Sequence, residues 1–154
     1  MDRKILNWDT LDSTLVSINK EKIVFTNGCF DILHPGHIHI LDQAKSYGDI
    51  LIVGLNSDES IKKLKGPKRP KVSQKDRLRI LSSIKFVDYA ILFEEDTPLK
   101  LIKKIKPNIL VKGGDYNSDD IVGSEFVKSN GGEIKIVQLL EGYSSSSLID
   151  KFEN

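Results

Sequence analysis

The chain has 154 residues, of which 39% are hydrophobic, and its 23 basic and 22 acidic residues give a formal net charge of +1. This is the size of one domain, and the charge balance excludes a general attraction to nucleic acid or to an anionic membrane. A single cysteine, Cys29, excludes an intrachain disulfide framework and a cysteine-rich zinc site. Because no apolar stretch approaches the length of a membrane span and no signal-type run is present, we expect a cytoplasmic protein that binds neither nucleic acid nor a membrane.

Apolar residues alternate along the chain between helical and strand-like spacing. In chain order this predicts a helix over 9–19, a strand over 22–26, a helix ended by Gly48 and a strand over 49–55. A short helix through Leu64, an irregular basic segment over 62–71, a helix over 74–84 and a strand over 86–93 follow. The rest of the chain is predicted to form a helix with Pro98 at its first position that ends before Pro107, a strand over 109–111, a helix over 123–130, a strand over 133–139 and a last helix that begins within 144–147.

This alternation predicts an α/β fold with a single, Rossmann-like, doubly wound sheet of five parallel strands flanked by helices. The continuous apolar run Ile50–Val53 favours burial on both faces of the sheet. Residues 1–20 are expected to form an N-terminal helical extension, and residues 21–154 the domain itself. Ligands are expected beyond the carboxyl ends of the strands.

The turn between the first strand and the next helix has the composition of an anion site. A helix N-terminus offers unpaired N–H groups and a partial positive charge, and glycines such as Gly28 and Gly36 let a ligand approach the backbone. His34 and His37 place two imidazoles beside the same position. Both rings can donate hydrogen bonds to phosphate oxygens.

Four segments rich in hydrogen-bond donors are expected to meet at this edge: the His34/His37 turn, the basic loop over 62–69, the segment Lys112–Tyr116 and the serines Ser144–Ser146. Neither a GxxxxGK[ST] loop nor a GxGxxG fingerprint is present. Imidazoles, ammonium groups and hydroxyls suit a triphosphate, because they stabilise charge that grows at phosphorus during transfer.

The segments Asn27–Asp31 and His34–His37 read Asn-Gly-Cys-Phe-Asp and His-Pro-Gly-His, and Gly142–Ser146 reads Gly-Tyr-Ser-Ser-Ser. They resemble the two signatures of the cytidylyltransferase-like HxGH nucleotidyltransferase superfamily, although that superfamily prefers threonine at Ser145 and Ser146. Further segments are similar to the heptose-1-phosphate adenylyltransferases, which occur alone or as half of a bifunctional heptose kinase/adenylyltransferase: Gly54–Asp58, Leu64–Gly66, Arg69–Pro70, Asp76–Arg77 and Val111–Tyr116.

The resemblance implies that residues 21–154 form a nucleotidyltransferase domain that uses ATP with Mg²⁺ held through the phosphates. The acceptor would be a sugar 1-phosphate, D-glycero-β-D-manno-heptose 1-phosphate, and the products ADP-heptose and pyrophosphate. It also implies a homodimer and a separate kinase that supplies the sugar phosphate. The implied catalytic residues are His34, His37 and Lys65. The implied nucleotide-binding residues are Asn27, Gly28, Cys29, Phe30, Gly36, Lys112, Gly114, Asp115, Tyr116, Ser144, Ser145 and Ser146, and the implied acceptor-binding residues are Asp31, Arg69 and Arg77.

Structural interpretations stand beside these roles. Asp31 and the serine run could serve as helix caps, Cys29 could be a small packed residue, and Arg77 could pair with nearby carboxylates. Three other functions also stand as alternatives: a cytidylyltransferase for glycerol 3-phosphate, a non-catalytic nucleotide-binding regulator and, more remotely, a nucleic-acid-binding module. The cytidylyltransferases usually carry threonine at the position of Cys29 and tryptophan at that of Tyr116.

Overall fold

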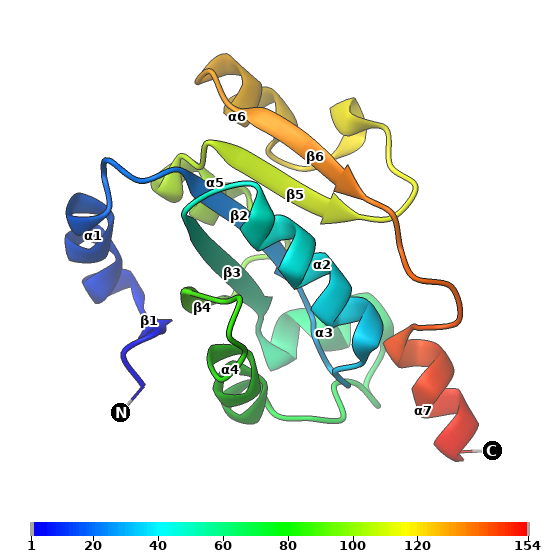
Figure 1. The fold of residues 1–154 in the computed structure, drawn as a ribbon. Helices are drawn as coiled ribbons and strands as arrows, with labels where there is room; N and C mark the ends of the chain where they lie inside the picture. Colours follow the sequence, from blue (N-terminus) through cyan, green and yellow to red (C-terminus); the bar gives the residue numbers. More distant parts are fainter. Residues whose placement is uncertain (1, 154) are drawn as a thin grey trace.

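The computed structural model describes residues 2–153, which form one parallel six-stranded sheet covered by helices (Figure 1). The strand order is β1-β4-β3-β2-β5-β6. The strands are β1 (Ile5–Leu6), β2 (Ile23–Gly28), β3 (Ile50–Asn56), β4 (Tyr89–Phe93), β5 (Ile109–Gly113) and β6 (Glu133–Val137). The helices are α1 (Trp8–Ser17), α2 (Pro35–Ser46), α3 (Asp58–Lys65), α4 (Gln74–Ser82), α5 (Leu99–Ile105), the 3₁₀ helix η1 (Ser118–Asp120), α6 (Ser124–Ser129) and α7 (Ser145–Glu153).

The sheet has one more strand than the five predicted from the sequence. The additional strand is β1, which pairs in parallel with β4 and places Ile5 opposite Ala90. Ala90 N donates to Lys4 O at 2.8 Å, and Lys4 Nζ donates to Val87 O at 2.8 Å. A two-residue strand carries no periodic signal of its own, so only its pairing partner reveals it.

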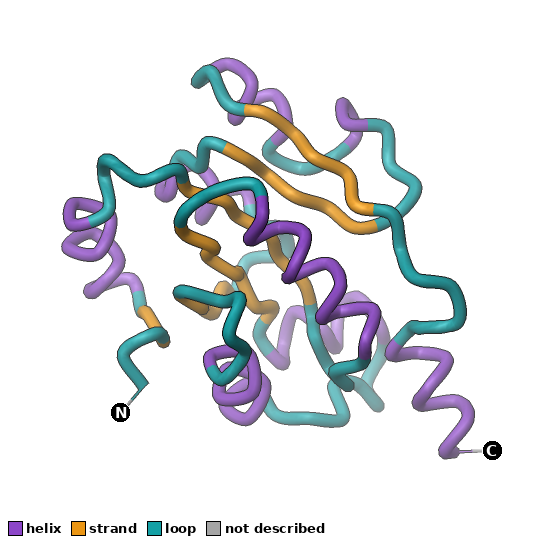
Figure 2. Tube along the Cα trace, viewed as in Figure 1, coloured by secondary structure: helices purple, strands orange, loops and turns teal. Residues whose placement is uncertain are grey.

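Two hydrophobic layers bury the two faces of the sheet, as the apolar run in β3 predicts. On one face, Phe25 and Ile52 pack in a cluster with residues of α1, α5 and α6. On the other face, Val24, Leu51 and Val53 pack in a cluster with residues of α2 and α4. Figure 2 shows helices on both sides of the strands. Successive side chains on a strand point to opposite faces, so each central strand contributes to both clusters.

The strand order reverses at β2, which pairs with β3 on one side and β5 on the other. Thr26 Oγ1 donates to Val111 O at 2.9 Å and ties these two strands together near their carboxyl ends. A reversal of this kind opens a crevice beyond the strand ends. The loops that follow β2, β3, β4 and β5 therefore surround the expected ligand site, and α7 lies beside the start of α2 (Figure 1).

Most element boundaries differ from the predicted ones by one to three residues. Helix α3 ends at Lys65, one residue after its predicted end at Leu64. Pro98 is the N-cap of α5 and not its first helical residue. Strand β4 begins at Tyr89, three residues later than predicted, because Val87 N still bonds to Ile84 O in the turn after α4. Within residues 2–153, none of the helices combines the length and the apolar character that crossing a membrane requires.

Candidate active site

The histidine pair at the start of α2 is fixed by two hydrogen bonds to the backbone. His34 is the N-cap, and its Nδ1 accepts from Gly36 N at 3.1 Å. His37 Nδ1 accepts from His34 N at 3.2 Å. A neutral imidazole that accepts at Nδ1 carries its proton on Nε2. Each ring therefore has one N–H group left to donate to a ligand.

The two rings stack with their centroids 3.8 Å apart and an interplanar angle of 24°. Burial lowers the pKa of His34. Burial, together with the charges of His34 and Lys65, lowers the pKa of His37 to about 4. Both imidazoles are therefore uncharged at neutral pH, and they act as neutral N–H donors.

The turn that carries these histidines is sterically crowded. A Cβ at Gly36 would lie 2.9 Å from His34 Nδ1, and a Cβ at Gly28 would lie 2.9 Å from the Phe30 ring. Phe30 itself has a φ of 47°, in the left-handed region that non-glycine residues rarely adopt. Strained backbone of this kind persists only where its surroundings fix it, and it is concentrated at functional sites.

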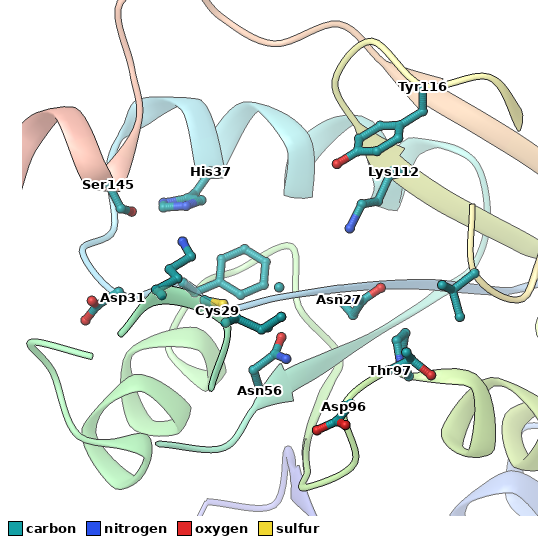
Figure 3. Close-up of a pocket in the computed structure, with 16 residues that line it drawn as sticks. Asn27, Cys29, Asp31, His37, Asn56, Asp96, Thr97, Lys112, Tyr116 and Ser145 are labelled. Atoms are coloured by element: carbon teal, nitrogen blue, oxygen red, sulfur yellow. The ribbon is translucent and has the colours of Figure 1, made fainter. Parts of the chain in front are cut away.

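A cavity of about 560 Å³ lies at the carboxyl edge of the sheet (Figure 3). Its lining combines residues from all four segments that the sequence singled out. Of the predicted site residues, those that line it are Asn27, Gly28, Cys29, Phe30, Asp31, His37, Lys65, Lys112, Tyr116 and Ser145. Side chains of His37 and Ser145 point into it from one side, and Lys112 and Tyr116 stand at the other (Figure 3).

Two lysines of this lining have no carboxylate partner within 4 Å in the described part of the chain. They are Lys65, at the end of α3, and Lys112, in β5. Burial lowers the pKa of Lys112, whose Nζ lies 5.6 Å from the Tyr116 ring centroid. An ammonium group that is partly buried without a counter-ion favours the binding of an anion.

Cys29 also lines the cavity, but its thiol is not activated. Burial raises the pKa of Cys29, and this effect outweighs the opposing charges of Lys65, Arg77 and Arg69. The thiolate is the nucleophilic form of cysteine, so a raised pKa keeps this residue inert near neutral pH. The interpretation of Cys29 as a small packed residue fits this geometry.

Asp31 reaches the cavity, but internal donors saturate its carboxylate. The side chain is fully buried, and it accepts from Lys71 N at 2.8 Å, from Val72 N at 2.9 Å and from Arg69 Nε at 2.8 Å. Burial alone would raise the pKa of Asp31, but these donors outweigh burial and lower it. Asp31 thus fastens the loop before α4 to the turn after β2.

Arg77, like Asp31, makes its hydrogen bonds within the protein. Its guanidinium is fully buried and donates to Val72 O at 2.9 Å, to the carbonyls of Cys29 and Asn56 at 2.8 Å, and to Asp58 Oδ1 at 2.7 Å. Arg77 is absent from the cavity lining. The contact predicted between Arg77 and the acceptor stays a prediction. In the structure the hydrogen bonds of its guanidinium are made within the protein.

The remaining predicted residues lie around the cavity without lining it: His34, Gly36, Arg69, Gly114, Asp115, Ser144 and Ser146. His34 is stacked behind His37, and Ser144 Oγ accepts from Ser147 N at 3.0 Å as a helix cap. Arg69 Nη1 donates to Ser146 Oγ at 3.3 Å. The ligand contacts predicted for these residues remain predictions.

Four lining residues had not been singled out as site residues or as parts of a motif: Asp96, Thr97, Pro98 and Val122. Asn56 and Leu64 also line the cavity, and they lie in segments that resemble the heptose-1-phosphate adenylyltransferases. Asn56 ends β3, and Asp96 to Pro98 follow β4. The rule that ligands bind beyond the carboxyl ends of parallel strands could have identified both places. No motif marks Asp96 to Pro98, because they belong to a strand end and not to a recurrent signature.

Comparisons with known proteins agree with this geometry. Residues 25–151 match the model of a family described as cytidylyltransferase-like. The chain is 55% identical over 144 residues to the bifunctional protein HldE of Helicobacter pylori, and 49% identical over 153 residues to that of Geobacter metallireducens. These alignments cover 94% and 97% of this chain but only 30% and 31% of the relatives, so the chain spans about a third of their length.

Two solved structures share the fold. A lipopolysaccharide core biosynthesis protein from Thermoplasma volcanium superposes with a TM-score of 0.64 at 33% identity, over 80% of this chain and 99% of that one. A pantoate-beta-alanine ligase from Francisella tularensis gives the same TM-score at 18% identity, over 97% of this chain and 76% of that one. The second likeness concerns the fold alone.

Proposed function

The chain belongs to the cytidylyltransferase-like family, and we propose that it is an adenylyltransferase that joins AMP from ATP to a sugar 1-phosphate. The sugar phosphate we propose is D-glycero-β-D-manno-heptose 1-phosphate, with ADP-heptose and pyrophosphate as products. Three findings support this choice: the motifs that resemble heptose-1-phosphate adenylyltransferases, the identity to HldE proteins, and a structural neighbour named for lipopolysaccharide core biosynthesis.

The observation that carries the proposal is the donor set of the cavity. His37, Lys65 and Lys112 reach one cavity from three separate segments, and both lysines lack a carboxylate partner within the described residues. Ser145 lines the same cavity, but its hydroxyl donates to Ile32 O. Such a set matches the oxygens of a polyphosphate. Donors that are already in place stabilise the charge that develops in a transition state without further reorganisation.

In the proposed reaction, an oxygen of the sugar phosphate attacks the α-phosphorus of ATP in line. The bond from that phosphorus to the oxygen that bridges to the β-phosphate breaks, and pyrophosphate leaves with the electron pair. The second pKa of a phosphate monoester is about 6, so the nucleophile is ionised at neutral pH and needs no general base. The histidines can therefore act as neutral Nε2–H donors, which agrees with the lowered pKa of both rings.

The residues of the cavity fit Mg²⁺ that arrives with the nucleotide. Within residues 2–153, no group of three His, Cys, Asp or Glu side chains could hold a metal ion unaided. Magnesium in such sites is commonly held by substrate phosphates, water and one or two carboxylates, and Asp96 is the carboxylate of the lining that would serve. When bound, the ion would neutralise charge on the departing pyrophosphate.

Pyrophosphate release tests the proposal directly. The protein is incubated with each nucleoside triphosphate and a panel of sugar 1-phosphates and glycerol 3-phosphate. We expect release with ATP and the heptose phosphate. Turnover confined to CTP and glycerol 3-phosphate would establish the cytidylyltransferase, and nucleotide binding without turnover for any pair would establish the regulator.

A further inference from the structure

A third aromatic ring adjoins the histidine pair. Tyr143, in the connection between β6 and α7, stacks on His34 with the ring centroids 5.9 Å apart and an interplanar angle of 21°. His34 is thus the ring that contacts both Tyr143 and His37. Offset stacking over such a distance is a favourable arrangement for aromatic side chains.

Gly36 provides the space in which these groups meet. A Cβ at this glycine would lie 2.9 Å from His34 Cε1 and 3.1 Å from Tyr143 Cβ. His34 is only 9% exposed, whereas Tyr143 is 44% exposed. The histidine is therefore nearly enclosed, whereas its tyrosine neighbour stays partly open to solvent.

The same segment anchors α7 to the turn that carries the histidines. Ser145, two residues after Tyr143, donates from Oγ to Ile32 O at 2.9 Å. The stacked ring and this hydrogen bond fasten the start of α7 to two points of the β2–α2 turn. A change in the seating of α7 would thus act on the serine hydroxyls and on His34 together.

We propose that Tyr143 is a positioning residue whose ring holds the His34 imidazole against His37, so that the Nε2–H donors of the pair and the start of α7 are set as one unit. The catalytic consequence rests on the function proposed above, whereas the positioning itself does not. The hydrogen bond from Gly36 N fixes His34 Nδ1, and the stacked rings of His37 and Tyr143 together restrict the tilt of its ring plane.

The role belongs to the ring and not to the phenol. In the described part of the chain, the Tyr143 hydroxyl makes no hydrogen bond. Tyr143→Phe should therefore preserve the effect, and Tyr143→Leu should remove it while keeping an apolar side chain in place. Phe152→Ala is the matched control, because Phe152 is also an aromatic residue of this C-terminal segment but is 81% exposed.

The first test reads the histidine tautomers by ¹⁵N NMR in the free protein. We expect the Nε2–H tautomer for His34 and His37 in the unchanged protein, in Tyr143→Phe and in Phe152→Ala. In Tyr143→Leu the His34 signals should move toward a mixture of tautomers. An unchanged His34 pattern in a folded Tyr143→Leu protein would overturn the proposal.

The second test reads the catalytic consequence. We expect Tyr143→Leu to lower kcat about tenfold and to change KM for ATP much less, because misplaced donors lose transition-state contacts more than ground-state ones. Tyr143→Phe and Phe152→Ala should retain the unchanged kcat. Equal kcat for the leucine and phenylalanine variants would refute the catalytic coupling. An absence of transfer in every variant would refute the proposed function instead, and the NMR result would still decide the positioning role.

Discussion

The wall of the cavity and the frame behind it use charged side chains in opposite ways. In the frame, Asp31 and Arg77 are fully buried and nearly all of their hydrogen-bonding capacity is met within the protein. In the wall, Lys65 and Lys112 have no carboxylate partner within the described residues. A charge that is saturated internally builds the fold, and a charge that is left unsaturated at a cavity is available to a ligand.

Arg69 stands between these two groups. Its Nε is paired with Asp31, its Nη1 reaches Ser146 in α7, and its Nη2 is buried without a hydrogen-bond partner among the described residues. The frame and the wall are therefore joined through this side chain. Substitutions in the frame are therefore expected to lower stability, and substitutions in the wall are expected to lower activity.

The largest effect is expected from Arg77→Met, which breaks the frame. The substitution leaves three backbone carbonyls, and the partly exposed carboxylate of Asp58, without their donor. Removing one partner of a buried charge network costs about 3–5 kcal/mol of stability. Urea denaturation should therefore show a midpoint far below that of the unchanged protein.

Lys65→Met is the control for this prediction, because it removes a cation from the wall. Its free energy of unfolding should stay within about 0.5 kcal/mol of the original, as for other surface changes. If Arg77→Met proved as stable as Lys65→Met, the frame would not be the support described here. Loss of acceptor affinity without loss of stability would return Arg77 to its predicted place beside the acceptor.

His37→Asn should have the next largest effect, on turnover. The asparagine oxygen can still accept from His34 N, whereas the Nε2–H donor is removed. Loss of one preorganised donor lowers kcat by about 10²–10³, or roughly 3–4 kcal/mol in the transition state. The measurement is pyrophosphate release at saturating ATP, and near-normal kcat would remove His37 from the chemistry.

The strand and helix pattern was largely predictable, because both depend on local periodicity and on caps such as Ser57 and Ser73. The convergence of the four donor segments was also predictable, since parallel strands present their carboxyl ends at one edge. Strand β1 could not be predicted, because its two residues depend on Ala90 far along the chain. Nor could the sequence tell that the partners of Arg77 are internal, because they lie 5 to 48 residues away.

Lys65→Met also tests the role of the cavity wall in turnover. If this ammonium group acts on charge that develops during transfer, kcat should fall more than ATP affinity does. We expect a loss in kcat of about 10- to 100-fold, smaller than for His37 because the lysine is exposed and its charge is screened by solvent. Initial rates at several ATP concentrations separate the two parameters, and a change confined to KM would assign Lys65 to binding alone.

The smallest expected effect is the dependence of stability on pH that the His37 imidazole contributes. The pKa of His37 falls from 6.5 to about 4 on folding, so between these values the unfolded chain binds a proton that the folded protein does not. Stability is then full above pH 6.5 and is lost as the pH falls toward 4. Because the ring is partly exposed, this contribution between pH 6.5 and pH 5 is about 1 kcal/mol.

Comparison with His37→Asn isolates this contribution, because the other groups titrate in both proteins. His34, whose pKa is also lowered by burial, remains in the variant, and the lowered pKa of Asp31 affects stability only below pH 4. Urea denaturation of both proteins at pH 6.5 and pH 5 should therefore show the smaller decrease in the asparagine variant. Equal decreases would mean that His37 keeps an ordinary pKa, and it would then carry a charge in the wall at mildly acid pH instead of acting as a neutral donor.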